Sequence, residues 1–332
     1  PNANCGRGIY VFRDLPELLA QARASNWQMV AQKYIERPLL VDDDRRKCDI
    51  RLWVLITSWN PATVFIWSEP YFRLASRPFT WDDGKLEDDR VHLTNRAVQK
   101  KGRKDATPPT EDEGHIWTLD RFFAWSSRTA QKVRYKKASD GTCAEGTARD
   151  AWDACTWPMM VEAVRACVLA CQDDVGVHPP GCFEFLGFDF LLDEQMWPWL
   201  LEANCSPDLC EDAGPSLRGL CQDAMTETVR IVEGRSTGDI TLPVVPEDGP
   251  ADGVSVSMDF RSRWRLCLHQ EQARRPCDLR LGKARKQAQL TKATGHPPPL
   301  SLLDLEIQRL SPQLKVLRGL LGRERFVHWM HP

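Results

Sequence analysis

The sequence predicts a mixed α/β fold, of the α+β kind, in which helices flank one sheet. Residues 28–40 and 49–59 are rich in β-branched and aromatic residues, which is typical of strands. Residues 182–207 contain two apolar runs around a polar turn, which predicts a β-hairpin. Residues 158–173 and 217–232 carry apolar residues at helical spacing, so we expect two helices to pack on the sheet.

Composition sets limits on the class of protein. The chain has 332 residues, of which 42% are hydrophobic, and its 13 Trp and 12 Phe can fill a sizeable core. Twelve Cys are scattered without a CxxC pair, which argues against a zinc ribbon or a thioredoxin-like motif and favours reduced thiols. The sequence shows no signal peptide and no run of 18 apolar residues, so we expect neither secretion nor a membrane span.

The chain divides into three zones. Residues 1–235 read as the structured region, and residues 236–253 read as a linker because prolines and glycines interrupt any regular element. Residues 254–332 form a basic tail that we expect to be helical or partly disordered, with an amphipathic helix at 300–326. Residues 100–113 are charged and contain prolines, which predicts a mobile surface loop.

The predicted hairpin carries a candidate metal site. Asp189 lies within its first apolar run, and Glu202 and Asn204 end the second run on one face of the strand. Buried carboxylates need cations, and Mg²⁺ held by carboxylates and nucleotide phosphates would satisfy them. The alternative is that Asp189 and Glu202 form ordinary salt bridges with Arg or Lys.

Two other segments could bind anions. The loop at residues 1–9 places glycines on both sides of Arg7, so its backbone N–H groups could turn toward phosphate, although it could also be a plain β-turn before a strand-like stretch at 9–12. Lys47, Asp49 and Arg51 alternate, so they share one face of a strand, and Arg73 follows further along the chain. The alternative for these residues is a solvated strand face with a local ion pair.

These segments, in this order, resemble the tubulin tyrosine ligase-like family over roughly residues 1–235. The matching segments are CGRGI, QKYIERPLL, KCDIR, WNP, YFR, HLTN, FEFLGFDFLLDE and PWLLEANCSP. Several motifs in the correct order are far more specific than any one of them. The resemblance implies an ATP-grasp fold that is incomplete at its N-terminus.

The resemblance also implies roles for individual residues. The residues expected to bind ATP are Arg7 and Gly8 in the first loop, Gln32, Lys33, Tyr34 and Ile35 around the adenine, and Thr94 and Asn95 near the phosphates. The residues expected to face the phosphates and the acceptor carboxylate are Lys47, Asp49, Arg51 and Arg73. Asp189, Glu202 and Asn204 would hold Mg²⁺. The implied reaction transfers the γ-phosphoryl group of ATP to a carboxylate, and an amino-acid amine then attacks the acylphosphate.

Within the family, the chain looks most like the tubulin glycine ligases, with glutamylases and tyrosine ligases as the next candidates. The implied partners are free glycine and the acidic tails of tubulin or microtubules, with no nucleic acid and no membrane, in the cytoplasm, the cytoskeleton or a ciliary axoneme. A non-catalytic tubulin-binding relative is the alternative of another class. In the family a Lys precedes the residue that is Pro1 here, so we expect this chain alone to be inactive.

Overall fold

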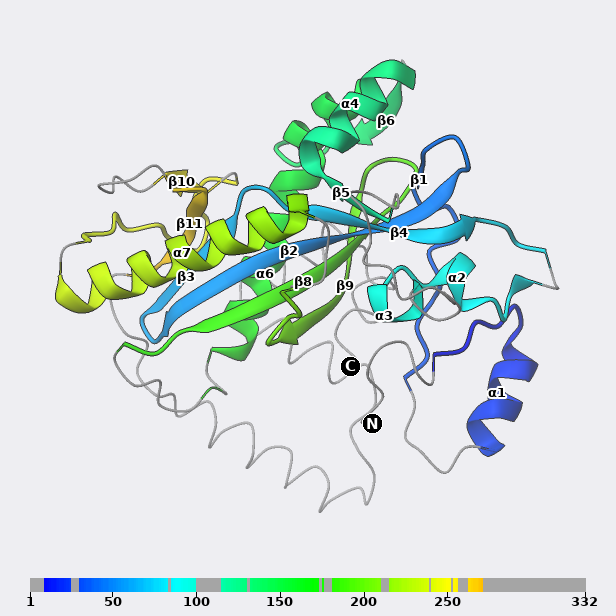
Figure 1. Cartoon of the computed structure of the whole chain (residues 1–332), viewed down its shortest axis with the longest axis horizontal. Coiled ribbons are helices and arrows are strands. Elements are labelled where there is room, and N and C mark those ends of the chain that lie inside the picture. Colours follow the sequence, from blue (N-terminus) through cyan, green and yellow to red (C-terminus); the bar gives the residue numbers. More distant parts are fainter. Residues whose placement is uncertain are drawn as a thin grey trace.

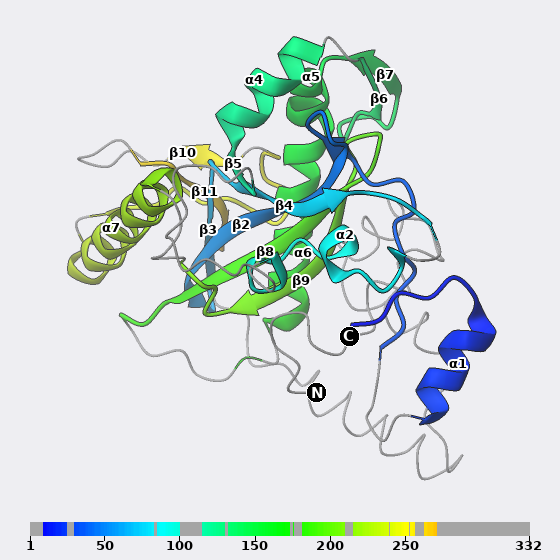
Figure 2. The same ribbon diagram turned by 45° about the vertical axis from the view of Figure 1, so that its right-hand side comes forward.

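The computed structural model describes residues 9–24, 30–82, 85–99, 115–129, 132–172, 175, 181–209, 215–238, 240–251, 253–255 and 262–270. A central sheet lies between helices on its two faces (Figures 1 and 2). Its strands are β1 (Leu40–Val41), β2 (Arg46–Trp59), β3 (Ala62–Trp67), β4 (Tyr71–Pro78), β5 (Ile116–Thr118), β8 (Glu184–Leu192), β9 (Pro198–Cys205), β10 (Val254–Ser255) and β11 (Trp264–His269). Strands β6 (Val133–Lys136) and β7 (Cys143–Gly146) form a separate hairpin.

The helices are α1 (Leu15–Ala24), α2 (Asp89–His92), α3 (Arg96–Gln99), α4 (Leu119–Thr129), α5 (Ala148–Ala151), α6 (Trp157–Cys171) and α7 (Pro215–Thr237), with a π-helical turn η2 (Trp152–Thr156) between α5 and α6. The mixed α/β prediction is confirmed, and so are the two predicted helices, as α6 and α7. Every strand pair in the described part of the sheet is antiparallel.

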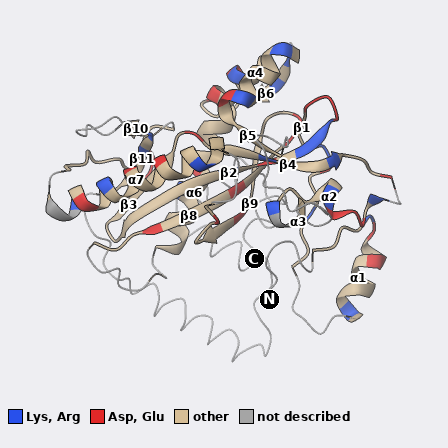
Figure 3. Cartoon of the chain, in the orientation of Figure 1, with Lys and Arg blue, Asp and Glu red and all other residues tan. Residues whose placement is uncertain are grey.

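Strand β2 is the centre of the sheet, because it pairs with β1, β3, β4 and β8. Side chains alternate between the two faces of a strand. Ile50, Leu52 and Val54 therefore enter one core, which α6 covers, while Trp53 and Leu55 enter the other core, which α7 covers. The charged residues at the start of β2, beside β1, precede both apolar stretches (Figure 3).

Helix α6 belongs to the first core. The helical run Ala148–Cys171 is long and apolar enough to cross a membrane by length and composition. However, 67% of its most apolar 18-residue window is buried inside the molecule, where Met160 and Val164 pack against the sheet. In this structure the run is the core helix under the sheet.

Two predicted strands are absent from the described residues. Residues 30–37 form no ladder, and within the range 28–40 only Leu40 joins a strand, where it pairs with Lys47. Pro38 lacks an N–H group and makes only an isolated bridge to Asp193, so the segment before it does not extend the ladder. Residues 9–12 are also irregular, and they lead into α1, which we did not predict. Residues 28 and 29 lie outside the described residues.

Residues 254–270 differ from the expected basic tail. Strand β11 pairs with β3 at the side of the sheet, and β10 pairs with β11. Trp264 is fully buried, and its ring lies 5.2 Å from that of Trp67. The alternating apolar residues of this stretch outweigh the basic character of the sequence around it. The loop predicted at 100–113 and the helix predicted at 300–326 lie outside the described residues.

A buried arginine of α6 holds this C-terminal segment on the core. Arg165 is 1% exposed and donates hydrogen bonds to the carbonyl oxygens of Cys267 at 2.7 Å, Gly249 at 2.7 Å and Pro250 at 2.5 Å. The Arg165 side chain therefore connects both β11 and the turn before β10 to helix α6.

We expect Arg165→Met to lower the free energy of unfolding by about 3 kcal/mol, because three carbonyl groups lose a charged donor. Urea denaturation followed by circular dichroism measures this change. The matched control is Arg134→Met, at an exposed arginine of β6 that lies 3.5 Å from Glu145. We expect the control to change stability by less than about 0.5 kcal/mol. Equal losses in the two variants would contradict this role for Arg165.

Candidate functional site

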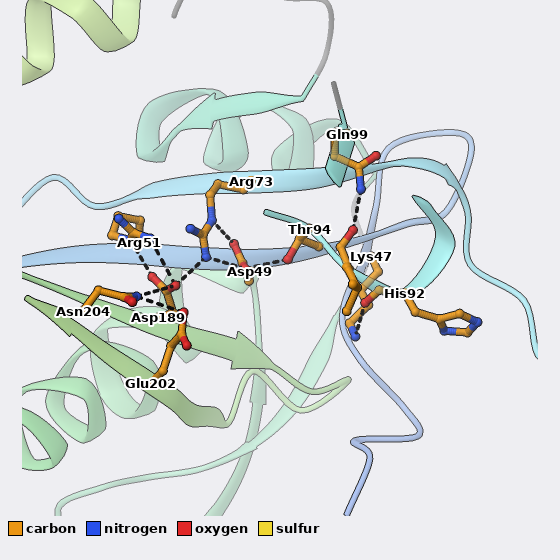
Figure 4. A network of polar contacts seen from close by, with 11 residues as sticks. Lys47, Asp49, Arg51, Arg73, His92, Thr94, Gln99, Asp189, Glu202 and Asn204 are labelled. Carbon is orange, nitrogen blue, oxygen red and sulfur yellow. Dashed lines mark hydrogen bonds and ion pairs between the residues drawn. The ribbon is translucent and has the colours of Figure 1, made fainter. Parts of the chain in front are cut away.

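The candidate site lies on the face of β2 that carries Trp53 and Leu55, at the charged end of the strand. Lys47, Asp49 and Arg51 share this face, as their spacing predicts. The register sets Asp49 opposite Arg73 of β4, and Arg51 opposite Asp189 of β8. Asp189 in turn lies opposite Glu202 of β9, beside Asn204 (Figure 4). Asn204 itself lies opposite Gly187. Four antiparallel strands therefore bring the predicted residues together.

Guanidinium and carboxylate groups alternate across these strands. Arg73 forms two parallel hydrogen bonds with Asp49, at 2.7 and 2.6 Å, and reaches Asp189 at 2.9 Å. Arg51 contacts both oxygens of Asp189, at 2.5 and 3.2 Å. All four residues are buried. The network fixes the positions of two arginines that could otherwise adopt many rotamers.

The charges in this network stabilise one another. Burial alone would raise the pKa of Asp189, but the guanidinium groups of Arg73 and Arg51 hold that pKa below its usual value. Burial would lower the pKa of Arg73, but Asp49 and Asp189 raise it well above the ordinary value. Both arginines therefore remain cations, and Asp189 remains an anion, throughout the neutral pH range.

Glycine at position 187 makes room for Arg51. A Cβ atom there would lie 3.0 Å from the Cδ and Nη1 atoms of Arg51 and 2.8 Å from the Cβ of Pro207. Our sequence analysis did not single out Gly187. A glycine inside an otherwise apolar strand is the signal that could have identified it, because such a residue often marks a close approach.

The predicted metal ligands meet at the open edge of the network. The Asn204 amide donates to Glu202 at 2.9 Å and to Asp189 at 3.3 Å. Asp189 also pairs with Arg51 and Arg73, as the salt-bridge alternative predicts, whereas Glu202 forms no ion pair with another described residue. No group of three His, Cys, Asp or Glu residues among those described could hold a metal ion. Two carboxylates and a side-chain amide are nevertheless the kind of oxygen ligands that Mg²⁺ takes, and the Asn204 amide, which here turns its nitrogen toward the carboxylates, would have to flip to offer its oxygen.

Thr94 and Asn95 follow α2 and approach the same network. The Thr94 hydroxyl donates to Asp49 at 2.5 Å, which connects this loop to the ionic network. Asn95 lies at the start of α3, where its carbonyl oxygen accepts from the N–H of Val98 at 3.0 Å. Thr94 therefore joins the residues on β2, while Asn95 shapes the turn beside them.

The predicted adenine-binding residues lie on the irregular segment before β1. Gln32 and Lys33 are exposed, and Lys33 forms an ion pair with Glu36. Tyr34 and Ile35 are half-buried, and the Tyr34 hydroxyl accepts a hydrogen bond from Lys47 at 2.8 Å. The segment is thus connected to the site through Tyr34. Arg7 and Gly8 lie outside the described residues.

Comparison with known proteins gives a consistent result. The chain matches the model of the tubulin-tyrosine ligase family over residues 1–239. It is 35% identical to tubulin monoglycylase TTLL3 of Danio rerio, over 69% of this chain and 28% of the relative. It is 33% identical to tubulin glycylase 3A of Drosophila melanogaster, over 70% of this chain and 21% of the relative. It is 31% identical to protein monoglycylase TTLL8 of Homo sapiens, over 87% of this chain and 32% of the relative.

The chain thus spans roughly a fifth to a third of the length of these relatives. The match to the human relative covers 87% of the 332 residues, which is more than the 239 residues that the family model matches. The similarity to this relative therefore continues past the family match.

We expect Arg73→Lys to lower the free energy of unfolding by about 3 kcal/mol, because one ammonium cannot replace the paired bonds to Asp49 and also reach Asp189. Urea denaturation at neutral pH measures the change. The control is Arg77→Lys, on the same strand, where the half-exposed guanidinium pairs with Asp88 at 2.8 Å. Its effect should stay below about 1 kcal/mol. A harmless Arg73→Lys would show that the network does not depend on the planar guanidinium.

Proposed function

The chain belongs to the tubulin-tyrosine ligase family, and from that membership we propose that the protein joins glycine to glutamate side chains of tubulin tails in an ATP-dependent reaction. The observation that carries the proposal is the row of buried cations on β2 and β4, next to the open edge formed by Glu202 and Asn204. Relatives named tubulin monoglycylase and tubulin glycylase support glycine as the donor.

The proposed chemistry needs no nucleophilic side chain. The acceptor carboxylate attacks the γ-phosphorus of ATP and ADP leaves, and the amine of glycine then displaces phosphate from the acylphosphate to form an amide bond. Charge shifts between oxygen atoms in both steps, so fixed cations are the groups that lower the barrier. Lys47, Arg51 and Arg73 would bind phosphate and carboxylate oxygens, and the Asp49 and Asp189 carboxylates orient the two arginines.

The nucleotide would lie between this network and the segment of Tyr34 and Ile35. Asp189, Glu202 and Asn204 would hold Mg²⁺, which neutralises part of the charge of the triphosphate. Asn204 bridges the two carboxylates, and Thr94 keeps Asp49 in place. We further propose that the protein acts in the cytoplasm, on the tubulin of the cytoskeleton and of axonemes.

We expect the full-length protein to transfer glycine, and neither glutamate nor tyrosine, to tail glutamates of tubulin. Mass spectrometry of tubulin after incubation with ATP, Mg²⁺ and each labelled amino acid in turn measures this. Incorporation of glutamate or tyrosine alone would place the protein in another branch of the family. A protein that binds tubulin without transferring any amino acid would be a non-catalytic relative.

We expect Glu202→Gln to abolish turnover without changing thermal stability, because it removes one ligand charge at an exposed position and hardly any volume. The control is Glu194→Gln, in the turn of the same hairpin, where the exposed carboxylate pairs with Arg37 at 3.0 Å. The control should keep full activity. Undiminished glycine transfer by Glu202→Gln would reject the proposed role in holding Mg²⁺.

A further inference from the structure

Lys47 differs from the two arginines of the site in how its charge is balanced. Its side chain is almost completely buried, yet it forms no ion pair with any described carboxylate. Its ammonium instead donates to the Tyr34 hydroxyl at 2.8 Å. It also donates to the backbone carbonyl of His92 at 2.8 Å (Figure 4). Neutral oxygen atoms therefore hold a buried cation. An incoming anion would not have to displace a carboxylate from it.

We propose that Tyr34 and His92 are positioning residues that hold the Lys47 ammonium in a directed hydrogen-bond chain and leave its third N–H for an anionic oxygen. The assignment of that oxygen to a nucleotide phosphate rests on the proposed function. The hydrogen-bond chain itself follows from the positions of the Lys47, Tyr34 and His92 side chains, which come from different segments.

The direction of the chain is set by what each group can donate. An ammonium has donors only, so the Tyr34 oxygen must accept from Lys47. The Tyr34 hydroxyl also lies 3.0 Å from the Nδ1 atom of His92. Its hydrogen is then free to be donated to Nδ1, and we assign His92 the tautomer in which Nδ1 is unprotonated and accepts it. The chain runs from Lys47 through Tyr34 to a neutral His92.

Aromatic packing holds these groups in place. The Lys47 ammonium lies 4.4 Å from the centroid of the Tyr34 ring, a distance at which the ring face attracts a cation. The Tyr34 ring packs against Trp81 at 4.9 Å and against His92 at 5.8 Å, and Phe79 packs against both Trp81 and His92. The Tyr34 ring thus belongs to a cluster of four rings, which restricts the movement of its hydroxyl.

The protonation states that this hydrogen-bond chain requires are those expected near neutral pH. Burial lowers the pKa of Lys47 to about 8, with Asp49 and Cys48 acting in the opposite direction. Burial and the Lys47 charge lower the pKa of His92, against the Lys85 backbone, Asp88 and Asp89. Burial raises the pKa of Tyr34. At pH 7 Lys47 is therefore charged, while His92 and Tyr34 are neutral.

The test is a pH titration of the chain with ¹⁵N-labelled lysine, followed by NMR. The Lys47 signal is identified by its loss in Lys47→Arg. Tyr34→Phe keeps the ring but removes an acceptor that stabilises the charged amine, so the titration midpoint of Lys47 should fall by about one pH unit. His92→Ala should shift the midpoint in the same direction. His92→Asn places an amide oxygen near the position of Nδ1 and should restore the wild-type midpoint.

A matched control is Tyr135→Phe. Tyr135 is a buried tyrosine of β6 that does not belong to the Lys47–Tyr34–His92 hydrogen-bond chain, so its substitution should leave the Lys47 midpoint unchanged. Unchanged midpoints in Tyr34→Phe and His92→Ala would overturn the proposal, and so would equal shifts in His92→Asn and His92→Ala. The dissociation constant for ATP, measured separately on the full-length protein, tests the proposed function. A failure to bind ATP would not change the conclusion drawn from the titration. An unchanged Lys47 midpoint would not change the conclusion drawn from ATP binding.

Discussion

The alternation of side chains along β2 determines where both cores and the site lie. One set of side chains, including Ile50 and Leu52, is apolar from Cys48 to Ile56 and packs toward α6. The other set changes character, from Lys47, Asp49 and Arg51 at one end to Trp53 and Leu55 at the other, and α7 packs on the apolar end alone. A slip of one residue in register would exchange the two sets and bury the charges in a hydrophobic core. The register that forms the cores therefore also forms the site.

The ionic network makes that register still more specific. Two buried arginines and two buried aspartates come from three strands, and each charge has a partner on a neighbouring strand. Desolvation of such groups costs several kcal/mol for each ion, and their mutual attraction offsets this cost only when the geometry is good. Removing one member would leave at least one buried partner with less compensating charge. The arginines are consequently rigid before any substrate arrives, which is the property that electrostatic catalysis requires.

Local pattern explains which parts of this arrangement the sequence could predict. The face shared by Lys47, Asp49 and Arg51 and the hairpin that carries Asp189 and Glu202 depend on alternation within one segment, and both predictions are confirmed. The pairing of Arg51 with Asp189 joins residues 138 positions apart, so only the fold shows it. The strand prediction for residues 28–40 was wrong because a strand also needs a neighbouring strand to pair with, and β-branched composition does not indicate whether one is present. Strand β11 was missed because the basic residues around it concealed a short apolar alternation.

Lys47 is a buried cation whose charge lowers the stability of the fold. A lowering of its pKa from 10.5 to about 8 corresponds to roughly 3 kcal/mol of folding stability. Since the unfolded state binds this proton more tightly, the cost is fully present below pH 8 and declines as the pH rises toward 10.5. The protein tolerates the cost because the Tyr34 hydroxyl and the His92 carbonyl solvate the ammonium without cancelling its charge. An anionic oxygen at the third N–H would recover part of this energy as binding, which a lysine already paired with a carboxylate could not provide.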